Sequence, residues 1–440
     1  MKNRKIFREF FVYVSLNILG QIAFSCYTLA DTFFVSAKLG TAGLTALNLA
    51  FPIFCLITGS GLMLGIGGGA KYSIYKSQGE DCRANQVYTN ALYLSVGFSV
   101  LFLTAGLFFS RGLVRLLGAD QAVFTPTHIY LQVMLLFSPA FLFNHLLQCF
   151  VRNDGRPGLS MAAMVIGSFS NVVLDYIFIF PLNMGIFGAI FATGLAPVIS
   201  ILVLLPHMVS QNRGFRFILK APCLADMGGI CSGGVPPMLT EVTSGVVMFL
   251  FNFIILNIAG NVGVAAFGVI TVMSLAVVSI YTGLSQGMQP IVSRSHGRGD
   301  NAAAREILLC GVATLLVLAA VIYGVIFSQA ETLVSVFNSD RDPILQSYAV
   351  RGVRLYFLAC PFMGWNIVFS TWLLSMERPR PAQTISLLRG FIVLIPAAFL
   401  LSSLFKLTGV WCAYPLTEAL VALLGMGYGV HRIAAIDKAM

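Results

Sequence analysis

Residues 10–37 read FFVYVSLNILGQIAFSCYTLADTFFVSA, and this stretch decides the fold class. It is longer than the roughly 20 apolar residues that a helix needs to cross a bilayer. Its single charged residue is Asp31. The basic residues before it resemble the start of a signal peptide, but the apolar run is too long and no small-residue cleavage site follows. We therefore interpret residues 10–37 as an uncleaved first membrane span.

Eleven further apolar stretches follow, separated by polar breaks rich in Gly and Pro, at residues 44–72, 88–110, 128–150, 159–181, 186–209, 230–258, 264–292, 305–327, 347–374, 384–405 and 409–430. Only 10% of the residues are charged, whereas a soluble domain has about 25%. This scarcity excludes soluble enzymes, disordered chains and coiled coils. The runs are too long for barrel strands and do not alternate. The sequence predicts an all-α polytopic membrane protein with 12 transmembrane helices.

The formal net charge of +10 would suggest a nucleic-acid partner in a soluble protein. No basic stripe with interleaved aromatic residues is present, so we expect no nucleic-acid binding. With the N-terminus inside, 20 of the 27 Lys and Arg residues fall on the cytoplasmic side of the predicted spans and 7 on the other. By the positive-inside rule, both termini are expected in the cytoplasm and the chain in the cell membrane, with lipids around it.

The two halves of the chain look related. Gly61 and Gly65 match Gly283 and Gly287, and other pairs such as Gly40 and Gly260 recur at nearly the same offset. We predict two six-helix lobes related by internal pseudo-symmetry, over residues 1–210 and 229–440, with a cytoplasmic linker over 211–228. Transporters often carry such repeats and bind substrate where the repeats meet.

Four acidic residues fall inside predicted spans, namely Asp31, Asp175, Glu241 and Glu418. Ionisable groups in hydrocarbon are expensive and indicate function by default. Tyr27 precedes Asp31 by four residues, and Asn171 precedes Asp175 by four, so each pair shares a helix face. Each Asp could instead serve as a helix cap or an inter-helix hydrogen-bonding group.

Thr193 adds a hydroxyl in the next span. Carboxylate, amide and hydroxyl oxygens are the hard ligands that suit Na⁺, and two carboxylates that lie close together favour a shared proton. We therefore predict an ion-coupling site made of Asp31, Asn171, Asp175, Thr193 and Tyr27. The first four of these would hold the metal if the ion is Na⁺, and no other cofactor is expected. The equivalent positions of the second half are Ile395 and Phe399, so the site is expected in the first half alone.

The second-half acids leave more alternatives open. Glu241 follows two prolines near the predicted start of the seventh span, where a carboxylate can stabilise the helix dipole. Glu418 could face a central cavity or bond Tyr414. With Gln289, these two acids form a candidate second-half cavity. No Lys or Arg is expected at mid-span to pair with them.

Two motif matches carry no function. Residues 65–70 read GIGGGA and imitate a dinucleotide fingerprint, but they lie in a span without a preceding strand. Their glycines are better explained by close helix packing. Gly297-Arg-Gly299-Asp300 imitates an intramembrane aspartyl protease, but this Asp lies in an arginine-rich loop. We expect no enzyme.

Several stretches, in order along the chain, resemble motifs of the MATE multidrug efflux antiporters. The resemblance is to the DinF-like prokaryotic branch of that family. These stretches are Tyr27-Thr-Leu-Ala-Asp31, Arg152-Asn-Asp-Gly-Arg-Pro157, Asn171-x-x-x-Asp175-x-x-Phe178, Gly185-x-x-Gly188-Ala-x-x-Ala-Thr193 and Gly287-Met-Gln289-Pro290. Two departures matter. The first span has no Pro, so any bend there would use Gly20 or Ser/Thr sites, and the tenth span has no Asp, which puts a second-half coupling site in doubt.

The resemblance implies two lobes around a cavity and the export of small amphipathic, cationic compounds by alternating access, driven by an inward H⁺ or Na⁺ gradient. It also implies that Asp31, Asn171, Asp175 and Thr193 form the coupling site. We expect a monomer whose cavity is lined by Phe, Met and Tyr. Two alternatives remain: a flippase for lipids or lipid-linked oligosaccharides, and, less favoured, an aspartyl protease that uses Asp175.

Overall fold

The computed structural model describes residues 2–338 and 342–437. The first half contains α1 (Lys2–Ser77), α2 (Asp81–Thr104), the π-turn η1 (Ala105–Phe109), α3 (Ser110–Leu116), α4 (Phe124–Leu136), α5 (Ser138–Asn153), α6 (Pro157–Ile179) and α7 (Gly185–Val209). The second half contains α8 (Leu224–Gly297), α9 (Asn301–Ser328), α10 (Ala330–Phe337), α11 (Pro343–Tyr356), the 3₁₀ turn η2 (Phe357–Ala359), α12 (Cys360–Ser375), α13 (Pro379–Leu387), the π-turn η3 (Leu388–Ile392) and α14 (Leu394–Asp437).

Twelve helical crossings can be traced through the described residues. Eight continuous helical stretches are long and apolar enough to span a membrane. Three of these reverse direction at a residue with positive φ, namely Gly40, Gly260 and Lys406, so each supplies two crossings. The pair α4 and α5, bent by 46°, supplies the remaining one. The all-α fold with 12 membrane helices is therefore confirmed, although the fourth span is a broken helix rather than the single run expected over 128–150.

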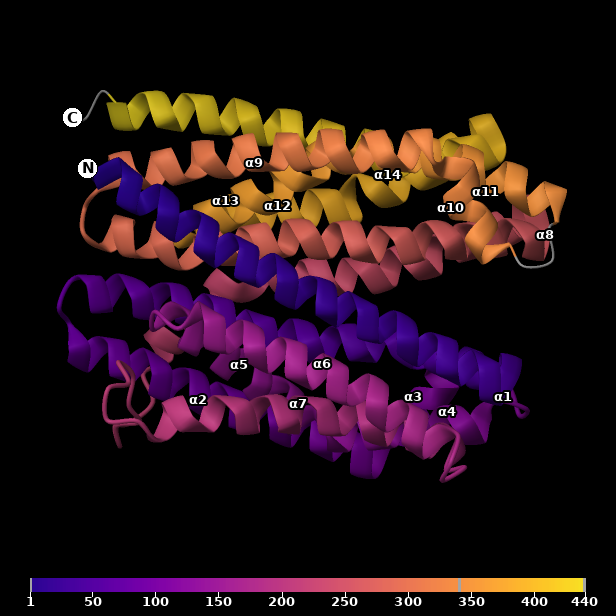
Figure 1. The fold of residues 1–440 in the computed structure, drawn as a ribbon, viewed down its shortest axis with the longest axis horizontal. Helices are drawn as coiled ribbons and strands as arrows, with labels where there is room; N and C mark the ends of the chain where they lie inside the picture. The colour runs from indigo at the N-terminus through magenta and orange to yellow at the C-terminus, as the bar shows by residue number, and fades with distance from the viewer. Residues whose placement is uncertain (1, 339–341, 438–440) are drawn as a thin grey trace.

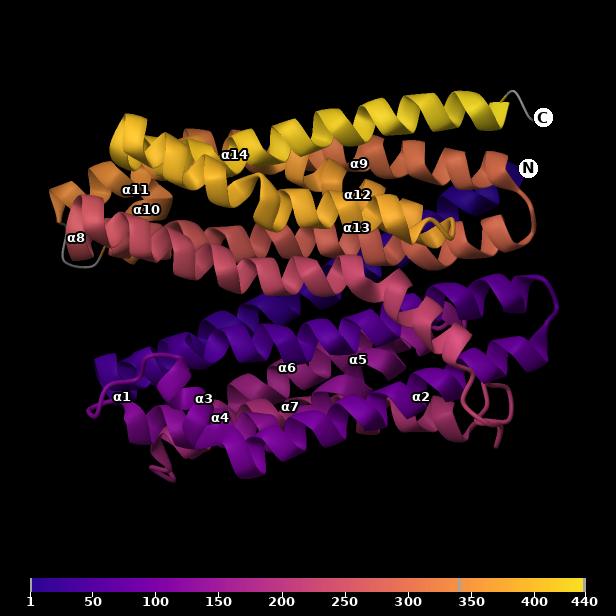
Figure 2. The ribbon, with the colours of Figure 1, turned by 180° about the vertical axis from the view of Figure 1, so that it is seen from behind.

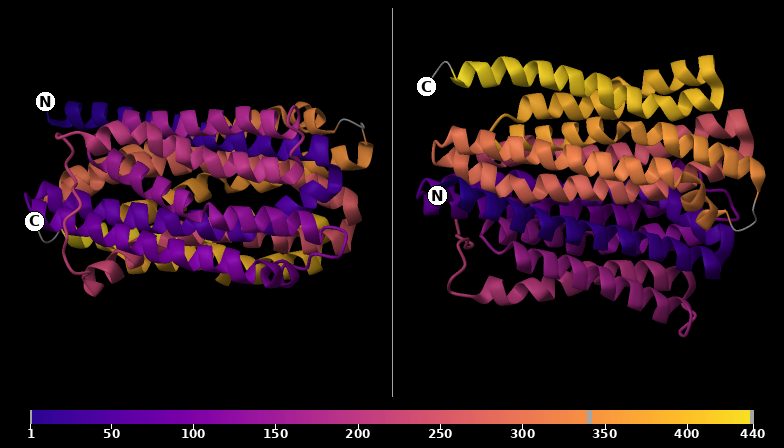
Figure 3. Two further views of the ribbon diagram at one scale, coloured as in Figure 1. Left: turned by 90° about the horizontal axis from the view of Figure 1, so that it is seen from below. Right: turned by 45° about the horizontal axis from the view of Figure 1, so that its top comes forward.

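The helices form two bundles that lie side by side, with α1–α7 in one and α8–α14 in the other (Figures 1 and 2). We refer to them as the N-lobe and the C-lobe. The first part of α1 crosses toward the C-lobe, where Phe10, Tyr13 and Val14 join its core. The helices run roughly parallel, and α1 begins where α14 ends (Figures 1 and 3). We call this end of the molecule the terminal end.

Positive-φ residues reveal the internal pseudo-symmetry. Residues with φ between 49° and 85° recur at positions 220 to 223 residues apart, as the pairs Gly40 and Gly260, Gly79 and Gly299, Gly155 and Glu377, and Asn183 and Lys406. Glycine adopts this conformation without steric penalty, which explains why the pair Gly40 and Gly260 was recognisable as a repeat in the sequence. The two lobes thus share their turns as well as their helix order.

The connection between the lobes is shorter than the linker expected over 211–228, because α8 begins at Leu224. This connection is held against the N-lobe. The backbone N–H of Gly214 donates to Asp154 Oδ2 at 2.8 Å, and that of Arg216 donates to Asn85 Oδ1 at 2.7 Å. The ring of Phe215 is buried against Tyr72, Tyr88 and Phe150.

Candidate functional site

The five residues of the predicted ion-coupling site all lie buried within the N-lobe. Tyr27 and Asp31 come from the first crossing of α1, Asn171 and Asp175 from α6, and Thr193 from α7. Asp175 and Asn171 are fully buried, and Asp31 is 6% exposed. The helical spacing of four residues explains why each pair reaches the same interior. The two carboxyl groups lie close enough for the charge of one to act on the other.

Each of the two carboxyl groups keeps one oxygen without a hydrogen-bond partner. These oxygens are Asp31 Oδ1 and Asp175 Oδ1, both fully buried. When the amide of Asn171 is oriented to satisfy both of its ends, its nitrogen donates to Asp175 Oδ2 at 3.0 Å and its oxygen accepts from the Thr193 N–H at 3.2 Å. A buried acceptor without a donor is costly, and a proton or a cation bound at these two oxygens would remove that cost.

Tyr130 of α4 is a further buried group beside the acids. Its phenol is 6% exposed and lies within electrostatic range of both Asp31 and Asp175. Tyr130 was not predicted, because no acidic or amide side chain lies three or four residues from it on its own helix. Tyr27 and Tyr130 thus place two hydroxyl groups near a pair of carboxyl groups.

A pocket of about 840 Å³ adjoins this cluster, and Tyr27 and Thr193 belong to its wall. We call it the central pocket. It follows one face of α5, from Asn144 and His145 through Gln148 and Cys149 to Arg152 in the last turn. Gln286 of α8 lines it from the other lobe. The central pocket therefore lies between the lobes and shares residues with the predicted ion-coupling site.

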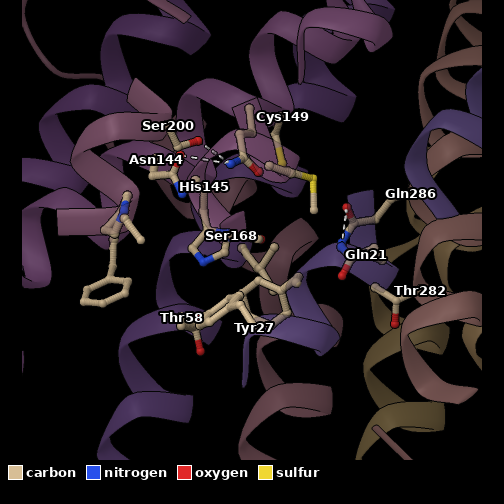
Figure 4. A pocket seen from close by; sticks show the side chains of 18 of the residues that line it. Gln21, Tyr27, Thr58, Asn144, His145, Cys149, Ser168, Ser200, Thr282 and Gln286 are labelled. Carbon is tan, nitrogen blue, oxygen red and sulfur yellow. Dashed lines mark hydrogen bonds between the residues drawn. The ribbon is translucent and has the colours of Figure 1, made fainter. Parts of the chain in front are cut away.

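The lining of the central pocket mixes polar and apolar side chains, and most of its surface is apolar. Phe24, Phe54 and Phe141 contribute aromatic surface, but more than half of the lining residues carry polar side chains. Figure 4 shows Gln21 and Gln286 together on one side, where Gln21 Nε2 donates to Gln286 Oε1 at 3.3 Å. On the other side, Gln148 donates to Asn144 at 2.9 Å and to Ser200 at 3.0 Å. The expectation of a wall made mainly of Phe, Met and Tyr is wrong for this pocket.

Glu241 lines both the central pocket and a neighbouring pocket of about 510 Å³, which we call the lateral pocket. It lies well inside α8, which begins at Leu224, so the alternative of a first-turn helix cap is wrong. Its carboxylate accepts no hydrogen bond from another described residue. Glu241 is thus a carboxylate that faces the space between the lobes.

Glu418 has a different environment. It is 1% exposed and lines neither of the two pockets. Its Oε1 accepts from Arg389 Nη2 at 2.7 Å and its Oε2 accepts from Asn366 Nδ2 at 2.7 Å. Arg389 lies in the π-turn η3 and lines the lateral pocket. The expectation that no cation pairs with a membrane acid is therefore wrong, because Arg389 reaches into the C-lobe from a predicted span end.

Gln289 also lies elsewhere than expected. It is fully buried and lines neither pocket. Its Oε1 accepts from Asn153 Nδ2 at 3.1 Å, and its Nε2 donates to Asn153 Oδ1 at 3.3 Å. These bonds join the lobes near the terminal end. Gln289 is therefore a lobe-contact residue and not a cavity residue.

Two other chemistries can be compared with the described residues: an aspartyl protease that uses Asp300, and a metal site made of His, Cys, Asp or Glu. Asp300 is the N-cap of α9, where its Oδ1 accepts from the Ala303 N–H at 3.1 Å, outside the membrane crossings. No group of three or more His, Cys, Asp or Glu side chains is arranged to hold a metal ion in the ranges that the structure describes.

A bundle of twelve crossings in two pseudo-symmetric lobes, with a pocket between them beside buried acids, is the architecture of a multi-pass membrane transporter. The chain belongs to the MatE family: the family model matches residues 17–177 and 236–400, most of both lobes. The resemblance noted in the sequence is thereby confirmed.

Relatives of the chain carry a shared description. It is 24% identical over 426 residues to the multidrug export protein MepA of Staphylococcus saprophyticus, covering 96% of this chain and 93% of the relative. The MepA of Staphylococcus haemolyticus is 25% identical with the same coverage.

Solved structures have the same fold. One, described as the outward-facing conformation of a multidrug resistance MATE family transporter of the MOP superfamily, has a TM-score of 0.91 at 22% identity, covering 98% of this chain and 96% of that one. A MOP superfamily transporter from Pyrococcus furiosus, described as having a binding pocket of reverse polarity, has a TM-score of 0.90 at 21% identity with the same coverage.

Proposed function

We propose that the protein is a secondary active antiporter that exports small amphipathic cations through the central pocket. Uptake of H⁺ or Na⁺ at Asp31 and Asp175 drives this export. The observation that carries the proposal is the adjacency of the two sites, which share Tyr27 and Thr193. The description of the relatives as multidrug export proteins supports the substrate class.

The chemistry of coupling follows from the unpartnered oxygens of Asp31 and Asp175. A proton or Na⁺ that binds there removes the penalty of two desolvated, mutually repelling carboxylates. Once Asp31 and Asp175 are neutralised, helices α1 and α6 can repack. This movement alters the wall of the central pocket through Tyr27 and Thr193. By linkage, substrate binding in the pocket must weaken ion binding by the same factor.

Glu241 supplies the attraction for a cationic substrate. It is a carboxylate that lines both pockets and accepts no hydrogen bond from another described residue. A cation in a site of low dielectric is held far more strongly than in water. The 20 to 7 distribution of basic residues supports a cell-membrane orientation in which the terminal end faces the cytoplasm.

The test is dye efflux from vesicles with an imposed pH gradient in one arm and an imposed Na⁺ gradient in the other. Asp31→Asn and Asp175→Asn should each abolish the gradient-driven component. Asp81→Asn, which changes a carboxylate that is 66% exposed, should leave it intact. Wild-type protein that responds to neither gradient, or Asp31→Asn protein with full efflux, would refute the antiporter.

The flippase alternative gains one observation, because Arg152 lines the central pocket and Arg389 lines the lateral pocket. A pyrophosphate headgroup would need such cations. The guanidinium of Arg389 is, however, neutralised by Glu418. Direct competition between a lipid pyrophosphate and a cationic dye for the purified protein separates the two functions.

A further inference from the structure

Arg152 is a buried cation without a counter-charge. It is 1% exposed and lies in the last turn of α5. Its Nη1 donates to Asn17 Oδ1 at 2.8 Å and to Gln286 Oε1 at 2.9 Å, and its Nη2 donates to Cys149 Sγ at 3.3 Å. Its Nε has no acceptor. Among the residues that the structure describes, no carboxylate forms an ion pair with Arg152.

The neighbouring carboxylate is engaged elsewhere. Asp154 Oδ1 accepts from the Tyr72 hydroxyl at 2.6 Å, and Asp154 Oδ2 accepts from His207 Nε2 at 2.8 Å. The backbone N–H of Gly214 donates to the same oxygen. Among the described residues, the guanidinium of Arg152 therefore donates only to neutral amide oxygens and a thiol, although Asp154 follows it two positions later.

This cation lies in the contact between the lobes near the terminal end. Arg152 belongs to the N-lobe and Gln286 to the C-lobe. The reciprocal bonds of Asn153 with Gln289, and the ion pair of Arg294 with Glu9 at 2.6 Å, lie beside it. Added methyl groups at Gly283 and Gly287 would overlap the backbone of α1, so the helices touch directly here.

Arg152 also lines the central pocket. Arg152 is the last of the α5 residues that line it, and the lobe contact continues beyond Arg152 toward the terminal end. Separating the lobes at this contact would open the pocket toward the terminal end. It would also expose the guanidinium to water.

We propose that the buried charge of Arg152 favours separation of the two lobes at this contact. Burying a charge without a counter-charge is unfavourable, and hydration on opening relieves that penalty. The amide oxygens of Asn17 and Gln286 hold the contact closed against this push. Arg152 is then a positioning residue that keeps the closed and open arrangements close in free energy, as alternating access requires. This inference rests on the proposed transport function for its purpose, and its physical content is a conformational equilibrium.

The proposal is tested by whether a substitution that removes the charge lowers or raises the ratio of open to closed populations. Spin labels attached through noncanonical amino acids at positions 83 and 380 report the distance between the lobes near the terminal end and leave all native cysteines in place. Arg152→Met removes the buried charge and should lower the ratio of open to closed populations about fivefold or more. Gln286→Met removes an acceptor but keeps the charge, and should raise the ratio by a similar factor.

Further variants complete the design. In the double variant Arg152→Met with Gln286→Met, the ratio should stay near that of Arg152→Met. Arg152→Gln supplies the same sign if the Met variant does not assemble. Arg298→Met, an exposed arginine at the same end, should change nothing.

If Arg152→Met and Arg152→Gln raise the ratio as Gln286→Met does, Arg152 stabilises the closed arrangement and the proposal is overturned. An unchanged ratio in all of these variants would overturn it as well. Because the distances are measured without substrate or ion gradient, this inference can fail while antiport stands, and antiport can fail while it stands.

Discussion

Arg389 donates to Glu418 through two hydrogen bonds, of 3.1 Å from Nε and 2.7 Å from Nη2, in the interior of the C-lobe. Asn366 donates to the second carboxylate oxygen at 2.7 Å. Asp31 and Asp175 of the N-lobe, in contrast, have no cationic partner among the described residues. Glu418 is therefore held in an ion pair, whereas one carboxylate oxygen each of Asp31 and Asp175 has no hydrogen-bond partner.

The first prediction concerns this ion pair. Glu418→Gln leaves Arg389 buried without its counter-charge and should lower the free energy of unfolding by about 3–5 kcal/mol. Replacing both residues, Arg389→Met with Glu418→Met, should recover most of that loss because no charge stays buried. Thermal unfolding of the purified variants in one detergent measures both. Two losses that simply add would contradict a direct pair.

The second prediction concerns Glu241 as the attraction for cationic substrates. Glu241→Gln should weaken binding of a cationic dye at least about tenfold, or about 1.4 kcal/mol, since a desolvated carboxylate is lost. Binding of a neutral analogue of similar shape should change little. Equilibrium fluorescence titration gives both affinities, and Glu80→Gln in the α1–α2 turn serves as the control. Equal losses for the charged and the neutral dye would indicate altered pocket shape instead.

The third prediction concerns Asn171, which orients Asp175. Asn171→Leu removes the amide that donates to Asp175 Oδ2. Without this donor the carboxylate is harder to ionise, so ion release should fail and gradient-driven efflux should fall by about tenfold or more. The control is Asn257→Leu, at an exposed residue of α8 whose amide bonds only its own helix. Vesicle efflux at matched protein content measures the change, and unaltered efflux in Asn171→Leu would argue against this role.

The fourth prediction concerns the close approach of α1 and α8. A methyl group at Gly234 would overlap the Met63 carbonyl oxygen, whereas one at Gly228 would meet open space. Gly234→Ala should therefore destabilise the protein by about 1–3 kcal/mol. Gly228→Ala should stay within about 0.5 kcal/mol of wild type. Unfolding temperatures compare the two, and similar values would show that the helices can move apart freely.

Much of the fold follows from the sequence, because hydrocarbon demands long apolar helices and the sequence contains twelve of them. Gly40 and Gly260 marked the repeat in advance, and both are helix reversals. The bend between α4 and α5 and the π-turn around Arg389 were not predicted, since hydropathy averages over about 20 residues and is blind to single backbone steps.

The N-lobe acids were found because i, i+4 spacing puts polar companions on one face of the same helix. Arg152 and Arg389 were missed because charges at the ends of apolar runs normally face water. Their burial depends on which helices of the other half or the same lobe cover them. Gln289 was misplaced for the same reason: its partner Asn153 lies 136 residues away in the sequence.

The most direct test of the central claim is the affinity of the purified protein for a cationic dye, measured against pH and against Na⁺ concentration. If Asp31 and Asp175 exchange an ion for substrate, dye affinity in the wild type should fall as pH falls or as Na⁺ rises. In the double variant Asp31→Asn with Asp175→Asn, it should depend on neither. Wild-type dye affinity that is independent of both pH and Na⁺ would contradict the coupling of these two sites.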